Sequence, residues 1–286
     1  MSSGRKAYRG LGMEGPIATW YARNTGRDLR RFIDVARSVT SRVEPGGRVL
    51  EVAPGPGFCA IEIAKSGRYQ VSGLDISESF VRIARENAKQ AGVVVDFRHG
   101  NASAMPFADE SFEFVVCSAA FKNFTDPVGA LDEIHRVLVP GGQASIYDLR
   151  KDASPEAIDA EVRRMHLSPI NALVTRWTFR FVLLKRAYTV EALDRLLAQS
   201  RFGAGTIRTE DIGFELRAIR RSGAHGIVRN PQRGLITADD QSATPSAGAG
   251  TGRPLAPAEP VRMRLREHYR HLDLGRRSRC ERSPRS

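Results

Sequence analysis

The loop at residues 53–57, Ala-Pro-Gly-Pro-Gly, is the segment whose residue types most clearly suggest chemistry. It follows an apolar run that contains Glu51, and glycines in such a loop let the backbone approach a ligand while free N–H groups at a helix start face an anion. The Glu51 carboxylate would repel a pyrophosphate, so it favours a ligand with a cationic group. By itself the pattern Gly55-x-Gly57-x-x-Ala60 also fits a loosened dinucleotide fingerprint, which leaves both ligand classes open.

Polar residues after the next two apolar runs help to decide between these ligands. Asp75 stands 18 residues after Gly57, where an acidic side chain can accept both ribose hydroxyls of an adenosine. Asn101 offers a carbonyl oxygen to the adenine amino group, and Ala102 offers a backbone N–H to a ring nitrogen. We therefore expect a nucleoside beside the cationic group that Glu51 favours.

The elements that must position these residues alternate between strand and helix. Strands are predicted at 48–53, 69–74, 93–98, 112–118 and 143–149, with helices up to 65, at 77–91 and at 127–138. This alternation predicts an α/β fold with a doubly wound, mostly parallel sheet, whose strands present their carboxyl ends at one edge. Later segments predict helices at 155–165, 171–185 and 190–199, then a closing antiparallel hairpin formed by 206–212 and 214–219.

The chain divides into three parts by composition. Residues 1–45 are expected to form an N-terminal helical cover and 46–222 the ligand-binding domain, with a helical cap inserted at about 153–188. The segment 223–286 holds 12 Arg against 6 Asp and Glu and is rich in small residues, so we expect a disordered, Arg-rich tail. A short amphipathic helix at 260–275 is an alternative for part of it.

Overall composition indicates a globular protein, with 41% hydrophobic and 27% charged residues and a net charge of +12. No stretch approaches the ~18 uncharged apolar residues of a membrane span, and the start MSSGRKAYRG lacks an apolar signal-peptide core. The three cysteines (Cys59, Cys117 and Cys280) are far apart, which favours free thiols in a reducing compartment over a disulfide framework or a metal site. We expect a cytoplasmic location and predict no metal, while the oligomeric state stays open.

The set of motifs between Val49 and Leu149, in this order and spacing, resembles the class I S-adenosylmethionine-dependent methyltransferases. The resemblance is to the small-molecule type related to the ubiquinone and menaquinone methyltransferases. It implies a seven-stranded Rossmann-like sheet, S-adenosylmethionine as the cofactor and a small, apolar methyl acceptor. This sequence departs from the family pattern in two places. Ala53 stands where the family has the first glycine of the loop, and Asn101 stands where the family usually has an acidic residue.

The resemblance also implies roles for individual residues. The methionine part of the cofactor would be held by Glu51, Ala53, Pro54, Gly55, Gly57 and Phe58, with Ser118 at the end of the fourth strand. The ribose would be bound by Asp75 and the adenine by Ile76, Asn101 and Ala102. Tyr21 resembles an N-terminal tyrosine that folds over the cofactor in many of these enzymes, although a lone aromatic at helical spacing is more often a core residue.

The acceptor is expected at the carboxyl ends of the fourth and fifth strands, near Lys122, Asn123 and Asp148. Methyl transfer needs a base only if the nucleophile is protonated, and His166 in the cap insertion is the one histidine placed to serve as it. The Asn/Asp-Pro-Pro-aromatic motif of nucleic-acid amino-methyltransferases is absent after the fourth strand, which counts against a nucleic-acid substrate.

Two alternative functions stay open from the sequence. The chain could be a nicotinamide-dependent oxidoreductase, although that reading does not explain Glu51 or the 100–107 segment. It could also be a cofactor-binding but inactive regulator whose basic tail engages a polyanion, with binding that depends steeply on salt.

Overall fold

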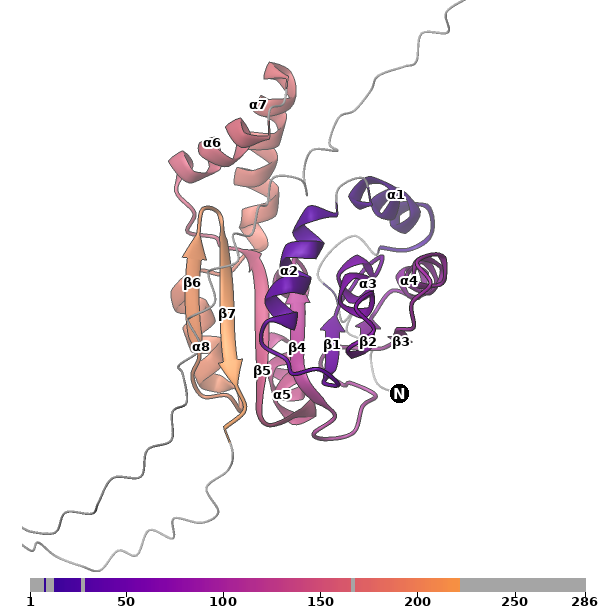
Figure 1. Ribbon diagram of the computed structural model, residues 1–286. Helices are drawn as coiled ribbons and strands as arrows, with labels where there is room; N and C mark the ends of the chain where they lie inside the picture. The colour runs from indigo at the N-terminus through magenta and orange to yellow at the C-terminus, as the bar shows by residue number, and fades with distance from the viewer. Residues whose placement is uncertain (1–7, 9–12, 27–28, 166–167, 222–286) are drawn as a thin grey trace, which may run out of the picture.

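The computed structural model describes Tyr8 and the ranges 13–26, 29–165 and 168–221. Within these ranges seven strands form one sheet in the order β3-β2-β1-β4-β5-β7-β6 (Figure 1). The strands are β1 (Arg48–Val52), β2 (Gln70–Asp75), β3 (Asp96–His99), β4 (Phe112–Ser118), β5 (Leu138–Leu149), β6 (Thr206–Glu210) and β7 (Gly213–Ile219). The helices are α1 (Gly15–Thr25), α2 (Arg30–Thr40), α3 (Phe58–Ala64), α4 (Glu78–Gln90), α5 (Pro127–Val137), α6 (Pro155–Arg164), α7 (Pro169–Thr178) and α8 (Val190–Gln199).

Strands β1 to β5 pair in parallel, whereas β7 runs antiparallel to both β5 and β6. The predicted doubly wound, mostly parallel seven-stranded sheet with a terminal antiparallel hairpin is therefore confirmed. A dinucleotide-binding sheet of the usual order 3-2-1-4-5-6 has no antiparallel strand inserted between its fifth and sixth positions. The placement of β7 thus separates this fold from that one.

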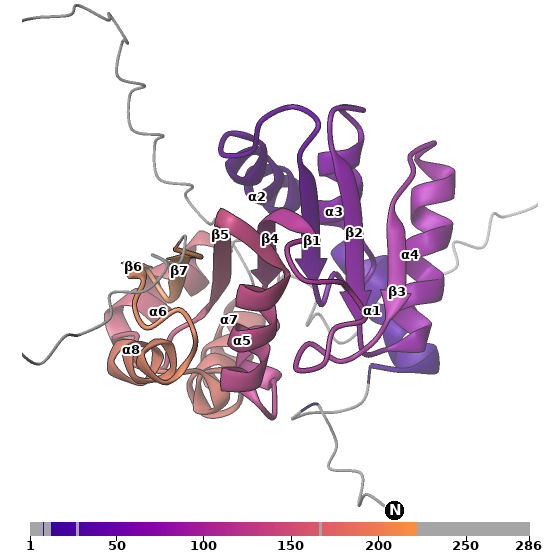
Figure 2. The same cartoon turned by 90° about the horizontal axis from the view of Figure 1, so that it is seen from below.

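Helices cover both faces of the sheet because its strands are apolar on both sides. Val49 and Phe114 belong to a core with α2, α3 and α4, while the neighbouring Leu50 and Val115 belong to a core with α5 and α8. Adjacent residues of a strand point to opposite faces, so β1, β2, β4 and β5 each supply both cores. Figure 2 shows α2 and α3 on one side of the strands and α5 and α8 on the other.

The cap is a separate small helical layer beyond the carboxyl end of β5 (Figure 1). It consists of α6, α7, a π-helical turn η2 (Phe179–Leu183) and a 3-10 turn η3 (Leu184–Arg186). Its buried residues pack with Leu149 and Ile212 in a third core. No helix in the described ranges has both the length and the apolar character needed to cross a membrane.

Strand β5, predicted to begin at residue 143, begins at Leu138 in the structure. Two further predicted elements differ from the structure by three residues or more at one end. The strand predicted at 93–98 begins only at Asp96, because pairing with β2 starts at that residue and Val94 is 93% exposed. The helix predicted at 171–185 is α-helical only up to Thr178 and then changes to the η2 and η3 turns. None of these differences moves the strand ends at which the expected ligand residues lie.

Candidate functional site

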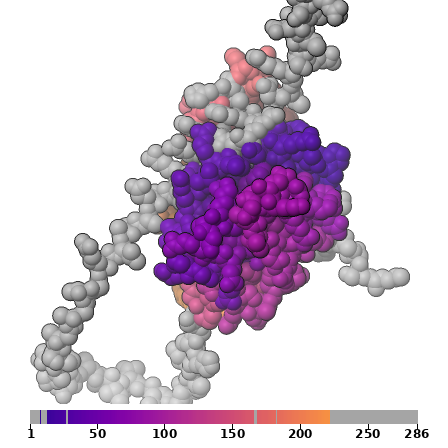
Figure 3. All heavy atoms as spheres, turned by 45° about the vertical axis from the view of Figure 1, so that its right-hand side comes forward, coloured from indigo at the N-terminus to yellow at the C-terminus, as the bar shows by residue number. Residues whose placement is uncertain are grey.

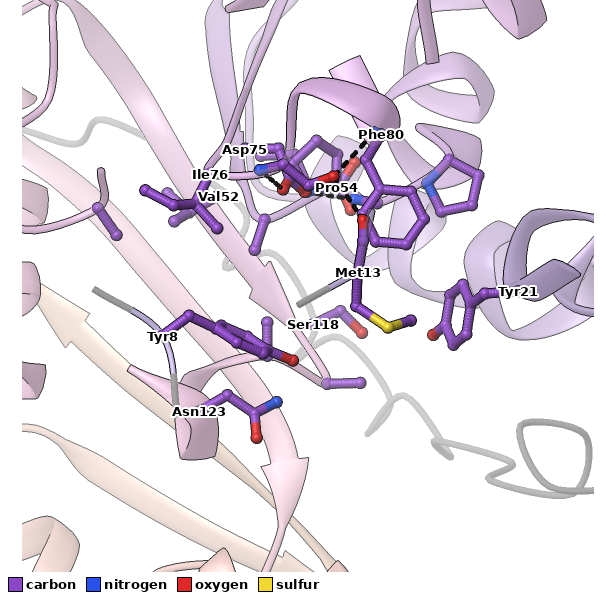
Figure 4. A pocket seen from close by; sticks show the side chains of 18 of the residues that line it. Tyr8, Met13, Tyr21, Val52, Pro54, Asp75, Ile76, Phe80, Ser118 and Asn123 are labelled. Carbon is purple, nitrogen blue, oxygen red and sulfur yellow. Dashed lines mark hydrogen bonds between the residues drawn. The ribbon is translucent and has the colours of Figure 1, made fainter. Parts of the chain in front are cut away.

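A cavity of about 690 Å³ opens at the carboxyl ends of β1, β2 and β4 (Figure 4). It brings together 12 of the residues singled out in the sequence: Tyr21, Glu51, Ala53, Pro54, Gly55, Asp75, Ile76, Asn101, Ala102, Ser118, Lys122 and Asn123. Parallel strands place their carboxyl ends at one edge, which is why residues more than 70 positions apart in the chain meet here.

The loop after β1 forms one wall of the cavity. Ala53 and Gly55 adopt left-handed backbone conformations with φ of 56° and 55°, which cost an alanine but not a glycine. A Cβ built on Gly55 would meet no atom within 4 Å, so the backbone here faces open space. A Cβ on Gly57 would instead meet Phe97 at 2.7 Å, so this glycine is required for packing of the loop against β3.

Glu51 is a buried carboxylate behind that loop, with only 2% of the residue exposed. Its Oε2 accepts a hydrogen bond from the Ala60 backbone N–H at 2.8 Å, near the start of α3. Burial raises the pKa of Glu51 to about 7, and the nearby Asp75 charge contributes to the rise. A cationic ligand group in the cavity would favour the ionised form of this carboxyl group.

Asp75 at the end of β2 is held in a fixed orientation by the backbone around it. Its Oδ2 accepts from the Gly55 N–H and its Oδ1 from the Ser77 N–H, both at 2.9 Å. Ser77 is in turn the N-cap of α4, where its hydroxyl accepts from the Phe80 N–H. Burial raises the pKa of Asp75 to about 6. The next residue, Ile76, is 39% exposed and lines the cavity.

Asn101 lies in a tight turn after β3. Its side-chain oxygen accepts from the Ser103 N–H at 3.0 Å, and its backbone oxygen accepts from the Ala104 N–H. An amide oxygen has two lone pairs, so Asn101 can still accept one further hydrogen bond from a ligand. Ala102 lines the cavity beside it.

A buried ion pair stands on the side of the cavity formed by β4 and β5. The Lys122 ammonium donates to Asp148 Oδ1 at 2.7 Å and to the Ala119 carbonyl at 3.0 Å. The Lys122 backbone N–H donates to the other Asp148 oxygen. Lys122 reaches the cavity wall, whereas the side chain of Asp148 is fully buried behind it. Of the three residues expected at the acceptor, only Lys122 and Asn123 therefore line the cavity.

Two further expected residues lie away from the cavity wall. Phe58 packs edge-on against Phe32 with ring centroids 5.4 Å apart, and Gly57 packs on Phe97. Asp148, Gly57 and Phe58 are thus placed to shape the site from behind. His166, the candidate base, falls outside the residues that the structure describes.

Several cavity residues could not be identified from the sequence, because they come from the N-terminal segment and the cap. Tyr8 forms an isolated bridge with Phe124, and burial raises the pKa of its phenol to about 12. Met13 is held near α4 because its carbonyl accepts from the Ser77 hydroxyl. Figure 4 shows Tyr8 and Tyr21 on opposite sides of the cavity with Met13 and Ser118 between them. A lone aromatic or methionine in a short segment gives no pattern that marks it as a cavity residue.

Other cavity features come from the same two regions. Tyr21 packs edge-on against Phe80 with ring centroids 5.7 Å apart. Trp20 of α1 and, from the turns after α7, Leu183 and Arg186 also line the cavity. No group of three or more His, Cys, Asp or Glu side chains suited to a metal ion occurs in the part of the chain that the structure describes.

Comparison with known proteins gives matches that centre on the segment from β1 to β5. Residues 50–146 match a family described as a methyltransferase domain. A demethylmenaquinone methyltransferase from Listeria welshimeri is 38% identical over 119 residues, which is 40% of this chain and 50% of that protein. A 2-phytyl-1,4-naphtoquinone methyltransferase from Synechococcus elongatus is 34% identical over 119 residues, which is 40% of this chain and 51% of that protein. The chain therefore spans about half the length of the curated relatives it matches.

A solved structure extends the likeness of the fold beyond the matched domain. A Methanococcus maripaludis protein, provisionally described as an S-adenosyl-L-methionine-dependent methyltransferase, superimposes with a TM-score of 0.60 at 20% identity. The match covers 79% of this chain and 99% of that one, so it shows a shared fold. The matched domain and the relatives confirm the resemblance drawn from the sequence, in that residues 50–146 are similar to the methyltransferase domain of the class I, small-molecule enzymes.

Proposed function

We propose that this chain binds S-adenosylmethionine in the cavity and transfers its methyl group to a small, apolar acceptor. The observation that carries the proposal is the convergence of two buried carboxylates, Glu51 and Asp75, with the open backbone of Gly55 on one cavity. A ligand with both a cationic amine and a ribose diol supplies a partner for each carboxylate. A pyrophosphate-bearing ligand would meet two buried anionic groups instead.

The residues fit the parts of this cofactor as follows. Glu51 and the backbone of residues 53–55 hold the methionine moiety, and Asp75 accepts hydrogen bonds from the ribose hydroxyls. The adenine packs on Ile76, and its edge meets Asn101 and the Ala102 N–H. Tyr21, Ser118 and the newly found Met13 close the middle of the cavity, while Gly57 and Phe58 support the loop from behind.

The rest of the cavity is suited to an apolar, aromatic acceptor. Tyr8, Phe124 and Leu183 line it together with the amide of Asn123 and the ammonium of Lys122. The relatives reported above are named as methyltransferases of demethylmenaquinone and of 2-phytyl-1,4-naphtoquinone. We accordingly propose a quinone-like or phenolic ring as the acceptor class.

The bound cofactor would supply an electrophilic methyl group on a sulfonium. The chain's own contribution is to orient the acceptor and to exclude water. Lys122, held in place by Asp148 at 2.7 Å, keeps a positive charge beside the acceptor region, where it stabilises a phenolate or enolate oxygen. His166 stays a candidate for the base that removes the acceptor's proton.

The remaining parts of the proposal concern partners and location. We propose a cytoplasmic enzyme that does not act on nucleic acid. The two cysteines that the structure describes, Cys59 and Cys117, are buried free thiols, as a reducing compartment allows. The comparisons give no support to an oxidoreductase or to an inactive regulator.

Calorimetric titration of the full chain tests the cofactor. S-adenosylmethionine and S-adenosylhomocysteine should both bind, whereas NADH and NADPH should not. Transfer of a labelled methyl group to a set of hydroquinones and phenols then tests the reaction. Binding of the sulfur ligands without transfer to any acceptor would favour the inactive regulator, and binding of a nicotinamide ligand alone would refute the proposal.

A further inference from the structure

An apolar stripe on α7 faces away from the protein core. It consists of Ile170, Leu173, Val174 and Trp177 of α7, at spacings i, i+3, i+4 and i+7, and continues into η2 with Phe181. Their exposed fractions are 76%, 63%, 44%, 58% and 54%. The opposite side of the same segment is packed, since Thr175 and Phe179 are 2% and 0% exposed. The α7 stripe therefore cannot turn inward without breaking the core of the cap, and an exposed apolar surface of this kind indicates an interaction site.

The α7 stripe is connected to the cavity by the chain itself. The η2 and η3 turns continue directly from α7, and they place Leu183 and Arg186 on the cavity wall. From the other side α1 contributes Ile17 and Trp20, which are 46% and 54% exposed, and Trp20 also lines the cavity.

The views agree on where these two helices stand. Figure 1 shows α1 and α7 at the same end of the sheet, beyond the carboxyl ends of the parallel strands. In Figure 3 the pink atoms of the cap stand at the top of the molecule, above the indigo atoms of α1. Exposed apolar side chains thus occur on both sides of the region where the cavity lies.

The charge around the α7 stripe limits what can cover it. Residues 169–186 contain Arg176, Arg180, Lys185 and Arg186 and no acidic residue. Arg176 pairs with Asp159 of α6, while Arg180 lies beside the stripe with its guanidinium 5.8 Å from the Phe181 ring centre. A two-fold contact between two copies would bring like charges together, because such an interface places the same patch on both sides. The tail at 223–286 carries a net charge of +6, from 12 Arg and 6 acidic residues, and is repelled in the same way.

We propose that the α7 stripe, together with Ile17 and Trp20 of α1, docks the protein on the surface of an anionic lipid bilayer. A helix with Trp, Phe and Leu on one face and basic residues beside it lies in the interfacial plane of a membrane, with its apolar face among the acyl chains. Each nearby Lys or Arg adds attraction to an anionic leaflet. If the proposed function holds, an apolar acceptor dissolved in the bilayer can reach the cavity from this side; the docking itself requires neither cofactor nor acceptor.

The experiment uses the fact that the chain contains two tryptophans, Trp20 and Trp177, both in the proposed contact. The full-length variant Trp20→Phe leaves Trp177 as the only reporter, and Trp177→Phe leaves Trp20. Each is mixed with vesicles of phosphatidylcholine and phosphatidylglycerol, with and without brominated acyl chains, in the absence of cofactor. We expect a blue shift of Trp177 emission and quenching by the brominated lipid, both absent with phosphatidylcholine alone at high salt.

The basic tail can bind anionic vesicles by itself, so sedimentation alone is not a test. The variant Leu173→Glu/Phe181→Glu, made in the Trp20→Phe background, should bind vesicles at least about tenfold more weakly and lose the quenching of Trp177. Val94→Glu is the matched control, because Val94 is 93% exposed but lies in the loop before β3; it should change neither measurement. A thermal melt of each variant checks that it is folded.

Three results would overturn the proposal. The first is a chain that sediments with vesicles while Trp177 stays exposed to water and unquenched, which would assign binding to the tail. The second is a Trp177 emission that is blue-shifted without vesicles. If that shift does not change with protein concentration, the α7 stripe is covered by the tail; if it does, the stripe is covered by a second copy. The third is unquenched Trp177 with vesicles but protection by an acidic amphipathic peptide, which would assign it to a protein partner.

Discussion

The carboxylate of Asp75, at the end of β2, accepts a hydrogen bond of 2.9 Å from the backbone N–H of Gly55, in the loop after β1. The contact joins the two strand ends that form the floor of the cavity. Because the other Asp75 oxygen accepts from the Ser77 N–H, the carboxylate also fixes the start of α4. A residue expected to bind ribose therefore also holds the loop expected to bind methionine.

Replacing Asp75 should weaken cofactor binding. Asp75→Ala removes the acceptor for the ribose hydroxyls and releases Gly55, so we expect a loss of about 1–3 kcal/mol in binding free energy for S-adenosylhomocysteine. Calorimetric titration measures it. The control is Asp96→Ala on β3, whose side chain is 50% exposed and pairs with Arg98 outside the cavity. Equal affinity of Asp75→Ala and the unmodified chain would contradict the assignment of the ribose site.

Glu51 should make the stability of the ligand-free protein depend on pH. Burial raises its pKa to about 7 in the folded chain, whereas in the unfolded chain it titrates near its ordinary ~4.3. The folded state thus favours the protonated group, and the free energy of unfolding falls as pH rises from about 4.5 to above 7, by up to about 3 kcal/mol. Asp75, with a pKa raised to about 6, adds to the same trend between about pH 4 and pH 6.

The variant Glu51→Gln isolates this contribution, because an amide oxygen can still accept from the Ala60 N–H. Urea unfolding at about pH 5 and about pH 8, without cofactor, should show a smaller loss of stability for the variant than for the unmodified chain. Bound S-adenosylmethionine should reduce the pH dependence of the unmodified chain, since its amine stabilises the carboxylate. Identical pH slopes for the two chains would show that Glu51 is ionised in the free cavity.

Ala53 should tolerate glycine without loss of stability. At φ 56° an alanine carries a strain of roughly 1–2 kcal/mol that glycine lacks, and this gain offsets the larger conformational entropy of glycine in the unfolded chain. We expect Ala53→Gly to be neutral or stabilising by up to about 1 kcal/mol in urea unfolding. Ala88→Gly in the buried face of α4 is the comparison and should cost about 1 kcal/mol or more. A clear destabilisation by Ala53→Gly would mean that the Ala53 methyl group contributes packing that outweighs the strain.

The pair formed by Lys122 and Asp148 should show strong coupling. Lys122→Met leaves the fully buried Asp148 without its cationic partner, at a cost of about 3–5 kcal/mol. The double variant Lys122→Met/Asp148→Asn removes both charges and should be more stable than the single variant. The free energies of unfolding of the unmodified chain, Lys122→Met, Asp148→Asn and the double variant together give the coupling energy. The exposed pair Arg37 and Asp34 is the control, and Arg37→Met should cost about 1 kcal/mol or less.

The sequence alone determined the order of strands and helices, because apolar runs, a glycine loop and acidic strand ends follow each other at spacings that only an alternating α/β sheet explains. It also identified Glu51, Gly55 and Asp75 as residues of the cavity, since each belongs to or closely follows a strand whose carboxyl end lies at the edge of the sheet where ligands bind. The strand bounds were predicted less accurately, since β3 begins at Asp96 rather than at 93 and β5 at Leu138 rather than at 143. Val93 to Val95 have the residue types of a strand but no paired neighbour, and pairing is a property of the tertiary structure.

Only the tertiary structure decided which side chains reach the cavity. Phe58 directly follows the 53–57 loop and Asp148 stands near the carboxyl end of β5, yet Phe58 packs on Phe32 and Asp148 lies behind Lys122. Tyr8 and Met13 belong to an N-terminal segment without a periodic pattern, and they reach the cavity through contacts with Phe124 and Ser77 across the fold. Sequence patterns record which face of an element is apolar, whereas a cavity wall is assembled from elements whose distance and orientation are set by packing.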